Sequence, residues 1–456
     1  MKNLLFELSK YIFTALAAYY TYVSYRGATA RNEEKKMRIY KVQNTIMFMI
    51  HFLGYLILYL QEYKIDYAIL YIAEFAFFFV ILVVYEVMYP KASRSLVNNM
   101  CMLMAIGFIM LARLSYDKCL KQFAIAVVGT VISFFVPWMI KKIRSFRNFA
   151  WVYCGTGLVL LISVLLGSKV FGANLVLTLG PVSVQPTEFV KIIYVMFVAS
   201  MFNKSTEFRQ IVITTGMAAL HVMILVVSND LGAALIFFIV YLMMLYIATG
   251  KALYIGAGLL AGSAAACLAY KLFNHVRTRV EVWLDPWSCI DDKGYQIAQS
   301  LFSIGMGSWF GVGLCQGMPN KIPVAEKDFM FSAITEEFGI IFSICIILIC
   351  LCCLILMMNI ASMCRTLFYR LVAVGLGVTY GFQVFLTIGG VIKMIPLTGV
   401  TLPFVSYGGS SMISSLMLFA IINGMYIMRQ DEGESNETGR NENSEKEKAE
   451  KRRKSE

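Results

Sequence analysis

The chain has 456 residues, of which 59% are hydrophobic and only 15% are charged. A water-soluble protein rarely combines so little charge with so much apolar surface, so lipid is predicted to surround most of the chain. The net charge of +12 does not indicate a nucleic-acid partner, because the basic residues gather in loops between apolar runs, as in membrane proteins.

Thirteen apolar runs, each of about 20 residues, are long enough to cross a hydrocarbon core as helices. Runs of this length without period-two alternation exclude a β-barrel. The sequence therefore predicts an all-α polytopic membrane protein with about 13 transmembrane helices. The runs lie near 8–25, 42–61, 66–89, 97–114, 119–140, 150–168, 188–203, 210–228, 231–249, 252–272, 334–358, 367–389 and 410–428.

Lys and Arg in the loops predict the orientation, because basic loops stay on the cytoplasmic side. An extracytoplasmic N-terminus and a cytoplasmic C-terminus satisfy this rule, and they place the longest loop, 273–333, outside. The basic segments assigned to the inside are 26–41, 141–147, 204–209, 359–370 and the tail from Arg429.

The tail, residues 429–456, mixes eight Lys and Arg with nine Asp and Glu. With almost no apolar residue it cannot bury a core, so it is predicted to be a disordered, charged cytoplasmic tail.

Glu188 and Lys191 open the run at 188–203, three residues apart. They therefore share one helix face and can pair or jointly hold a polar group. Thr187 can cap this helix, and Pro186 ends the extended segment before it. Charged residues within spans are costly and so are candidates for function. A structural ion pair near the interface is the alternative.

Two aspartates lie near the predicted starts of helices on the outer side. Asp230, in the turn before the run at 231–249, is interpreted first as a helix N-cap. Asp328 lies at the water edge of the run at 334–358, with Glu336 and Glu337 deeper. For Asp328 both a cap and a chemical role remain open.

The loop 273–333 is far longer than a usual connection, and such loops tend to be functional. Its glycines, from Gly305 to Gly317, allow the backbone to approach a ligand or re-enter the interface. Cys289 and Cys315 share this loop, and whether they pair is left open. The polar and aromatic candidates in it are Arg277, Arg279, Asp285, Trp287, Tyr295 and Gln296.

Residues 393–411 join the last two spans and read Lys-Met-Ile-Pro-Leu-Thr-Gly-Val-Thr-Leu-Pro-Phe-Val-Ser-Tyr-Gly-Gly-Ser-Ser. Two prolines and three glycines at membrane depth predict irregular backbone that lines a cavity, since lipid does not tolerate unpaired backbone groups. A well-packed kink is the alternative.

Together these strings resemble the SEDS family (shape, elongation, division and sporulation), whose members RodA, FtsW and SpoVE polymerise peptidoglycan glycan strands. The most specific match is the segment from Pro396 to Ser411. The segment from Gln185 to Lys191 is similar to the family's Gln-Pro-Ser-Glu stretch with its lysine, and Asp230-Leu231-Gly232 to its Asp-Leu-Gly turn. Tyr295-Gln296, Gln299-Ser300 and Asp328-Phe329 continue the resemblance in the same order.

The resemblance covers about residues 97–428 and divides the chain into three parts. Residues 1–96 hold about three extra N-terminal transmembrane helices, 97–428 a ten-helix SEDS-like core, and 429–456 the tail. One departure is that Val176 stands where the family usually has a Trp, which puts any substrate contact of that Trp in doubt. The role of the extra helices is not given by the resemblance.

The resemblance implies a glycosyltransferase that polymerises lipid II on the outer face of the cell membrane, by one inverting displacement with Asp328 as general base. The implied substrate-binding residues are Lys191, Glu188, Gln185, Arg279, Lys393, Ser406 and Tyr407. Among them Lys191, Arg279 and Lys393 are the candidate cations for the pyrophosphate, and Glu188 is expected to orient Lys191.

No metal-ligand spacing is present, although a divalent cation could share the neutralising role. The implied partners are lipid II, the nascent glycan strand, membrane lipid and a class B penicillin-binding protein that supplies transpeptidation. Two alternatives stay open: a flippase for the lipid-linked precursor, and a non-catalytic scaffold for division or sporulation. The resemblance does not distinguish a member for elongation, division or sporulation.

Overall fold

The computed structural model describes residues 2–30, 32–142, 144–165, 168–170, 173–179 and 182–453. Nearly all of these residues are helical. The first ten helices are α1 (Lys2–Thr29), α2 (Glu33–Glu62), α3 (Ile65–Met88), α4 (Arg94–Leu114), α5 (Tyr116–Lys142), α6 (Ala150–Leu165), α7 (Pro186–Lys204), α8 (Phe208–Val227), α9 (Leu231–Thr249) and α10 (Ala252–Leu272). The others are α11 (Asn274–Leu284), α12 (Tyr295–Gly307), α13 (Met330–Phe338), α14 (Ile340–Met363), α15 (Leu367–Val391) and α16 (Gly409–Arg453).

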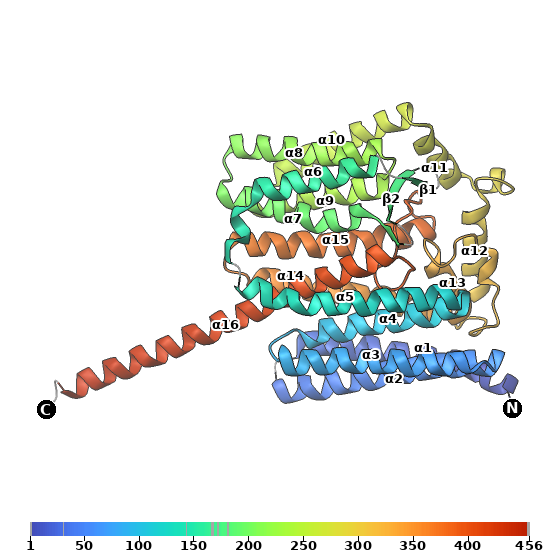
Figure 1. Ribbon diagram of the computed structural model, residues 1–456, viewed down its shortest axis with the longest axis horizontal. Coiled ribbons are helices and arrows are strands. Elements are labelled where there is room, and N and C mark those ends of the chain that lie inside the picture. Colours follow the sequence, from blue (N-terminus) through green and yellow to red (C-terminus); the bar gives the residue numbers. More distant parts are fainter. Residues whose placement is uncertain are drawn as a thin grey trace.

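The long helices lie side by side along one axis, and the two chain termini lie at opposite ends of this bundle (Figure 1). The short helices α11 and α12 lie at the end where α1 begins, which we call the loop end (Figure 1). At the other end, the tail end, α16 leaves the bundle. The apolar runs predicted from the sequence lie mostly in helices, although the run at 150–168 ends in a strand and the run at 334–358 is divided between two helices. The predicted helical membrane fold is confirmed.

Within the described residues, ten helices are long and apolar enough to cross a membrane. They are α2, α3, α4, α5, α8, α9, α10, the α13–α14 pair, α15 and the first part of α16. Because α1, α6 and α7 do not meet that criterion of length and composition, the count of thirteen spans stays a prediction.

Three short strands lie between α6 and α7, and the sequence analysis did not predict them. They are β1 (Ser168–Val170), β2 (Ala173–Leu179) and β3 (Val182–Val184), which form an antiparallel sheet in the order β1-β2-β3. In the β1–β2 pairing, Val176 lies opposite Ser168. The run 175–179 is apolar, contains β-branched residues and is too short to span a membrane, which favours a strand over a helix.

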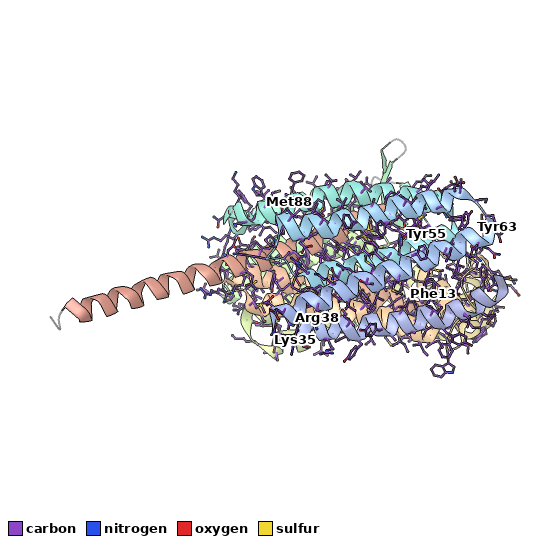
Figure 2. The ribbon with its side chains drawn as sticks, turned by 90° about the horizontal axis from the view of Figure 1, so that it is seen from below. Phe13, Lys35, Arg38, Tyr55, Tyr63 and Met88 are labelled. Carbon is purple, nitrogen blue, oxygen red and sulfur yellow. The ribbon has the colours of Figure 1, made fainter. Side chains whose placement is uncertain are left out.

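The three N-terminal helices lie next to one another on one face of the bundle, where Figure 2 labels Phe13, Tyr55 and Met88. Helix α2 packs against α1, α3 and α4, and α1 also packs against α14. As a result α4 is enclosed: every residue from Ser95 to Ala112 is buried. An apolar helix that is buried all round belongs to the interior of a bundle rather than to its lipid-facing edge.

A buried polar cluster joins the N-terminal helices to α5. His51 Nε2 on α2 lies 2.8 Å from Glu74 Oε2 on α3. Glu74 Oε1 accepts a hydrogen bond of 2.8 Å from the Tyr55 hydroxyl and one of 3.7 Å from the Cys119 thiol. His51 and Glu74 are fully buried, so the contacts of this carboxyl group fix how α2 and α3 lie against α5.

The apolar run at 334–358 was expected to be one helix, but the helix breaks at Gly339, whose φ is +88°. The loop after α12 satisfies the backbone groups that the break exposes. Val312 N and Gly313 N donate to the carbonyls of Glu336 and Glu337, and Ile340 N donates to Ser308 O at 3.0 Å. Such a break is tolerated at membrane depth only where other backbone replaces the lost hydrogen bonds.

Glycine is required at this break because the backbones approach closely. A Cβ at Gly311, which has φ +81°, would lie 2.2 Å from Glu337 O, and one at Gly307 would lie 2.0 Å from Thr335 O. Gly307 and Gly311 therefore pack against the protein's own backbone, whereas the sequence analysis expected the glycines of this loop to let the backbone approach a ligand or re-enter the interface.

Helix α16 continues to Arg453 and projects from the tail end as a single helix (Figure 1). This differs from the disordered tail predicted for 429–456. The physical reason is that the tail is rich in Glu, Lys and Arg, which are strong helix formers even without a core to bury. Near the start of the tail, Asp431 forms ion pairs of 2.7 Å with Lys91 and Lys141.

The buried cluster around Glu74 predicts a large effect of its removal. Replacing Glu74 with Ala leaves the buried groups of His51 and Tyr55 without an acceptor, which should lower the free energy of unfolding by about 2–4 kcal/mol. Thermal unfolding of the purified protein in detergent measures this. Asp66→Ala is the matched control, because Asp66 is an exposed acid on the same helix. Equal melting temperatures for the two variants would contradict the structural role of Glu74.

Candidate active site

The segment 392–408, which joins α15 to α16, lies at the loop end and forms the centre of the candidate site. Its backbone is irregular, with φ of +73° at Gly399 and +67° at Phe404. Polar side chains of α15 satisfy it: Thr387 Oγ1 donates to Val400 O, and Gln383 Nε2 donates to Thr401 O, each at 2.9 Å. We call this segment the 392–408 loop.

Asp328 lies against the 392–408 loop. A Cβ built on Gly399 would be 3.8 Å from Asp328 Oδ2, and the Asp328 side chain is half-buried. Two residues earlier, Glu326 O accepts a 2.7 Å hydrogen bond from Tyr407 N, which ties the Asp328 segment to the loop.

The helix-cap alternative for Asp328 is wrong. Helix α13 begins at Met330 with Phe329 at the N-cap position, and in the described chain no side chain caps it. The Asp328 carboxyl group therefore does not cap the start of α13. Burial raises the pKa of Asp328 above that of an ordinary aspartate, while the positive charges of Lys327 and Arg279 oppose this rise.

Arg279, on α11, contacts the same turn of the 392–408 loop. Its Nη1 atom donates to Leu397 O at 3.3 Å and to Thr398 O at 3.2 Å. Burial lowers the pKa of Arg279, and the negative charges of Asp230 and Asp328 act against this. The guanidinium therefore stays charged near both carboxyl groups, since even a lowered arginine pKa lies far above neutral pH.

Asp230 is the N-cap of α9, as predicted: its Oδ1 accepts a 3.0 Å hydrogen bond from Ala233 N. The other oxygen, Oδ2, is buried and has no hydrogen-bond partner among the described residues. Burial raises the pKa of Asp230, and the charges of Lys191 and Arg279 lower it in part. Asp230 thus lies within electrostatic range of both cations.

Gly232 explains why the Asp-Leu-Gly turn fits under the 392–408 loop. A Cβ at this position would lie 2.5 Å from Val400 Cγ2 and 3.2 Å from Thr398 O. Only a residue without a side chain lets α9 begin so close to the loop.

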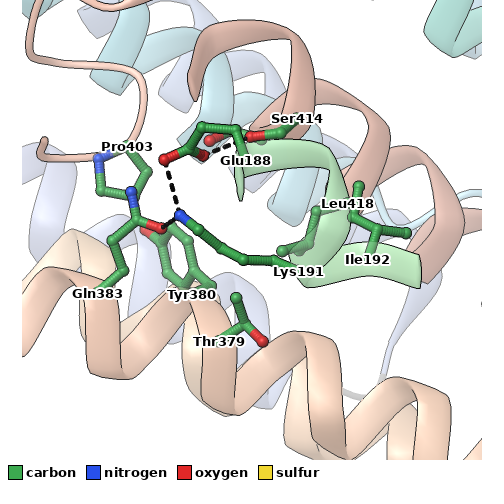
Figure 3. Close-up of a pocket in the computed structure, with 10 residues that line it drawn as sticks. Glu188, Lys191, Ile192, Thr379, Tyr380, Gln383, Pro403, Ser414 and Leu418 are labelled. Atoms are coloured by element: carbon green, nitrogen blue, oxygen red, sulfur yellow. Dashed lines mark hydrogen bonds and ion pairs between the residues drawn. The ribbon is translucent and has the colours of Figure 1, made fainter. Parts of the chain in front are cut away.

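Lys191 and Glu188 form a second, closed cluster, shown in Figure 3. Lys191 Nζ donates to Glu188 Oε1 at 2.8 Å and to Gln383 Oε1 at 2.9 Å. Glu188 Oε2 accepts a 2.8 Å hydrogen bond from the Ser414 hydroxyl. The predicted pairing of Glu188 with Lys191 on one helix face is therefore present.

The cavity beside Lys191 is small. It is lined by residues of α7, α15 and α16, and its free volume of about 10 Å³ is near the lower limit for one water molecule. Lys191 is only 5% exposed. In this arrangement its ammonium group neutralises Glu188 and has no room beside it for a phosphate.

The start of α7 differs from the prediction. The helix begins at Pro186 with Gln185 at the N-cap position, and Gln185 N donates to Ser410 Oγ at 2.9 Å. The predicted cap, Thr187, lies inside the helix, and its buried hydroxyl has no partner in the part of the chain that the structure describes. A proline tolerates the first helical position because it has no N–H to pair, and the helix therefore starts two residues earlier than predicted.

Lys393 and Ser406 make contacts within the fold. Lys393 Nζ donates to Leu284 O at 3.3 Å, and Trp283 Nε1 donates to Lys393 O at 3.1 Å, so this region ties α11 to the 392–408 loop. Ser406 Oγ accepts a 3.2 Å hydrogen bond from Leu402 N inside the loop. Neither contact brings the side chain to Asp328.

Gln383, Ser414 and Gln122 are site residues that the sequence analysis missed. Gln122, on α5, accepts a hydrogen bond from Gly408 N at 3.2 Å and donates to Ser406 O at 3.4 Å. Gln383 and Ser414 complete the Lys191 cluster. For the two glutamines the available signal was an isolated amide within an apolar run, which is costly in lipid unless it has a partner.

Cys289 keeps its thiol, which donates to the carbonyls of Asp285 and Pro286 at 3.7 and 3.8 Å, so the pairing with Cys315 left open above is not formed. Among the described residues, no group of three His, Cys, Asp or Glu side chains could hold a metal ion.

The structure of this chain is similar to solved structures of RodA-type proteins. A chain of a peptidoglycan synthase complex, in which polymerization and crosslinking are coordinated, aligns with a TM-score of 0.62 at 24% identity, covering 74% of this chain and 97% of that one. RodA of Thermus thermophilus aligns with a TM-score of 0.53 at 22% identity, covering 74% and 97%. At these identities the likeness concerns the fold.

Sequence comparison is more specific. Peptidoglycan glycosyltransferase RodA of Mycobacterium tuberculosis is 32% identical over 364 residues, covering 73% of this chain and 77% of that protein. Probable peptidoglycan glycosyltransferase FtsW of Neisseria gonorrhoeae is 28% identical over 359 residues, covering 68% and 76%. Residues 93–431 match the FtsW/RodA/SpoVE family, described as "Cell cycle protein". This chain is therefore a multi-pass membrane protein that belongs to the FtsW/RodA/SpoVE family.

Proposed function

We propose that this peptidoglycan glycosyltransferase polymerises lipid II at the loop end of the bundle, with Asp328 as the general base. Family membership and the names of the relatives support the activity. The observation that supports the residue is the position of Asp328: a half-buried carboxyl group beside Gly399 that caps no helix and lies near the charge of Arg279.

The chemistry requires one base. The acceptor hydroxyl of N-acetylglucosamine attacks C1 of the donor muramyl sugar, a C–O bond forms as the bond from C1 to the pyrophosphate breaks, and the hydroxyl proton passes to the carboxylate of Asp328. Attack from the side opposite the leaving group inverts C1 in a single displacement, so no second carboxylate is needed as a nucleophile. A positioned base contributes a factor of about 10² to 10⁴.

The leaving pyrophosphate needs positive charge, and Arg279 is the best placed of the three predicted cations. Its electrostatic partners are Asp230 and Asp328, the proposed base. Lys191 neutralises Glu188 in a cavity with space for about one water, and Lys393 donates to the backbone of α11. Lys191 and Glu188 then act by holding Gln383 in place, and through it Thr401 of the 392–408 loop.

Gln185, Ser406 and Tyr407 contribute to substrate binding in this proposal by shaping the loop. Their hydrogen bonds are with the loop or its neighbours: Gln185 with Ser410, Ser406 with Leu402, and Tyr407 with Glu326. A divalent cation bound together with the substrate would supply further positive charge to the leaving pyrophosphate.

The proposed orientation places the loop end outside and the tail end in the cytoplasm, because the basic loops lie at the tail end. The lipid-linked substrate then meets Asp328 on the outer face of the membrane, and the growing glycan strand leaves there. The proposed partner is a class B penicillin-binding protein, in line with the structural likeness to a chain of a complex that coordinates polymerization with crosslinking.

The first test uses the purified full-length protein, lipid II and, where activity needs it, the partner transpeptidase. Asp328→Ala and Asp328→Asn should lower the rate of glycan-strand formation by a factor of about 10² to 10⁴, because the acceptor hydroxyl loses its base. Asp291→Asn is the control, since it removes an exposed acid of the same long loop.

Two outcomes would contradict this proposal. If wild type and Asp328→Ala make equally little polymer while wild type moves lipid II across a vesicle bilayer, the protein is a flippase. If neither polymer nor transport occurs with the partner present, the protein is a scaffold.

The second test concerns pH. A base works when deprotonated, so the rate falls as the pH drops through the pKa of Asp328, which burial raises above the ordinary value. Replacing Arg279 with Gln removes a positive charge that lowers this pKa, so the acid limb of the rate profile should move to higher pH. Arg279→Lys should retain the wild-type limb, and Lys393→Gln serves as the control. An unchanged limb in Arg279→Gln would show that Arg279 does not act on Asp328.

A further inference from the structure

A polar crevice lies at the tail end, between the N-terminal helices and the family core, far from the proposed active site. It opens between α2 and α3, and α4 forms its floor. Lys41 and Asn44 line it from α2, Leu82 and Glu86 from α3, and Arg94 and Asn98 from α4. We call it the junction crevice.

The junction crevice is much larger than the cavity beside Lys191. Its free volume is about 70 Å³, against about 10 Å³ there. On this measure one water needs about 10–15 Å³, so the crevice holds about five waters or a group of similar size. A phosphate, with five heavy atoms, is such a group.

Two cations face this space. Arg94 Nη1 forms an ion pair of 3.1 Å with Glu86, whose side chain is 58% exposed at the rim. Lys41 makes no ion pair within the described residues. The crevice therefore carries two positive charges and one negative charge, and the negative one lies at its mouth. An anionic group that enters meets uncompensated positive charge.

Polar atoms with no partner lie along the same turn of α2. Asn44 Oδ1, in the lining of the crevice, and Gln43 Nε2, just outside that lining, are buried and lack a hydrogen-bond partner among the described residues. The other amide atom of Gln43, Oε1, accepts a 3.0 Å hydrogen bond from Asn98 Nδ2. Buried polar groups without partners are rare and need an explanation, most simply a bound group that the chain itself does not contain.

The depth of the crevice fits a lipid headgroup. Lys41 lies eight residues after the start of α2 at Glu33, which is about 12 Å along the helix axis. The basic residues Lys35 and Arg38 lie nearer the same helix end, as labelled in Figure 2. Crevices between transmembrane helices with basic residues at this depth are sites where lipid headgroups bind.

We propose that the junction crevice binds the headgroup of a glycerophospholipid, with its phosphate at Lys41 and Arg94 and a donor group at Asn44 Oδ1. The headgroup must carry a hydrogen-bond donor beyond the phosphate, because Asn44 Oδ1 needs one. Phosphatidylethanolamine supplies an ammonium, which also suits Glu86, and phosphatidylglycerol supplies a hydroxyl. Phosphatidylcholine has no such donor and should bind poorly.

This site would link the two parts of the chain. The family match begins at residue 93, so Arg94 and Asn98 belong to the family core, whereas Lys41, Asn44 and Glu86 belong to the extra helices. A lipid bound between them contacts both parts at once. Its binding should therefore stabilise the packing of α2 and α3 on α4.

The test uses the full-length protein, stripped of lipid in detergent and titrated with single lipids under native mass spectrometry. Wild type should bind one phosphatidylglycerol or phosphatidylethanolamine at a concentration at least about tenfold below that needed for phosphatidylcholine, and its melting temperature should rise with either lipid. Whichever of the two binds more tightly identifies the donor. Lys41→Ala with Arg94→Ala should abolish the preference.

Two further variants keep the proposal open to refutation. Lys35→Ala with Arg38→Ala removes the same charge from two residues near the same helix end that do not line the crevice, and it should retain the preference. Leu82→Trp fills the crevice without changing charge and should lose it, which covers the case in which removal of Arg94 harms folding. The proposal is overturned if phosphatidylcholine binds as well as the other two lipids. It is also overturned if removing Lys35 and Arg38 weakens the lipid preference as much as removing Lys41 and Arg94.

Discussion

The need to satisfy backbone polar groups in lipid governs this structure. At two places in the described chain where helical geometry is interrupted, specific groups replace the lost hydrogen bonds. In the 392–408 loop, Arg279 donates to the carbonyls of Leu397 and Thr398, and Thr387 and Gln383 donate to those of Val400 and Thr401. At the break at Gly339, the backbone of 308–313 supplies the hydrogen bonds. The candidate site lies where these irregular segments meet.

The same contacts give the site its division of roles. The Lys191 cluster is linked to the 392–408 loop through Gln383, which donates to Thr401 O. Arg279 and Asp328 lie against the turn at 397–399. The positive charges of Lys191 and Arg279 both act on the carboxyl group of Asp230. A change in the Lys191 cluster can therefore reach the proposed base without a direct contact, by moving the loop that both share.

Much of the fold could be predicted from sequence because helix length and hydrophobicity are local properties. The thirteen apolar runs fall mostly in helices, and the Asp230 cap and the Glu188–Lys191 pair follow from spacing alone. Features that depend on distant backbone could not be predicted. The break at Gly339 is stable only because the loop after α12 satisfies it, and Gln383 meets Lys191 only after α15 packs on α7. Glu74 was overlooked, although an acid within an apolar run was itself a signal.

The enclosure of α4 has a consequence for assembly. The family match begins just before this helix, so without the N-terminal extension α4 would have a lipid-exposed side. Here α2 covers that side, and the His51–Glu74 pair holds the cover in place. A second membrane protein that approaches from this direction meets α1 to α3 instead of the family core. The extension therefore decides which flank of the enzyme is left for lateral association in the bilayer.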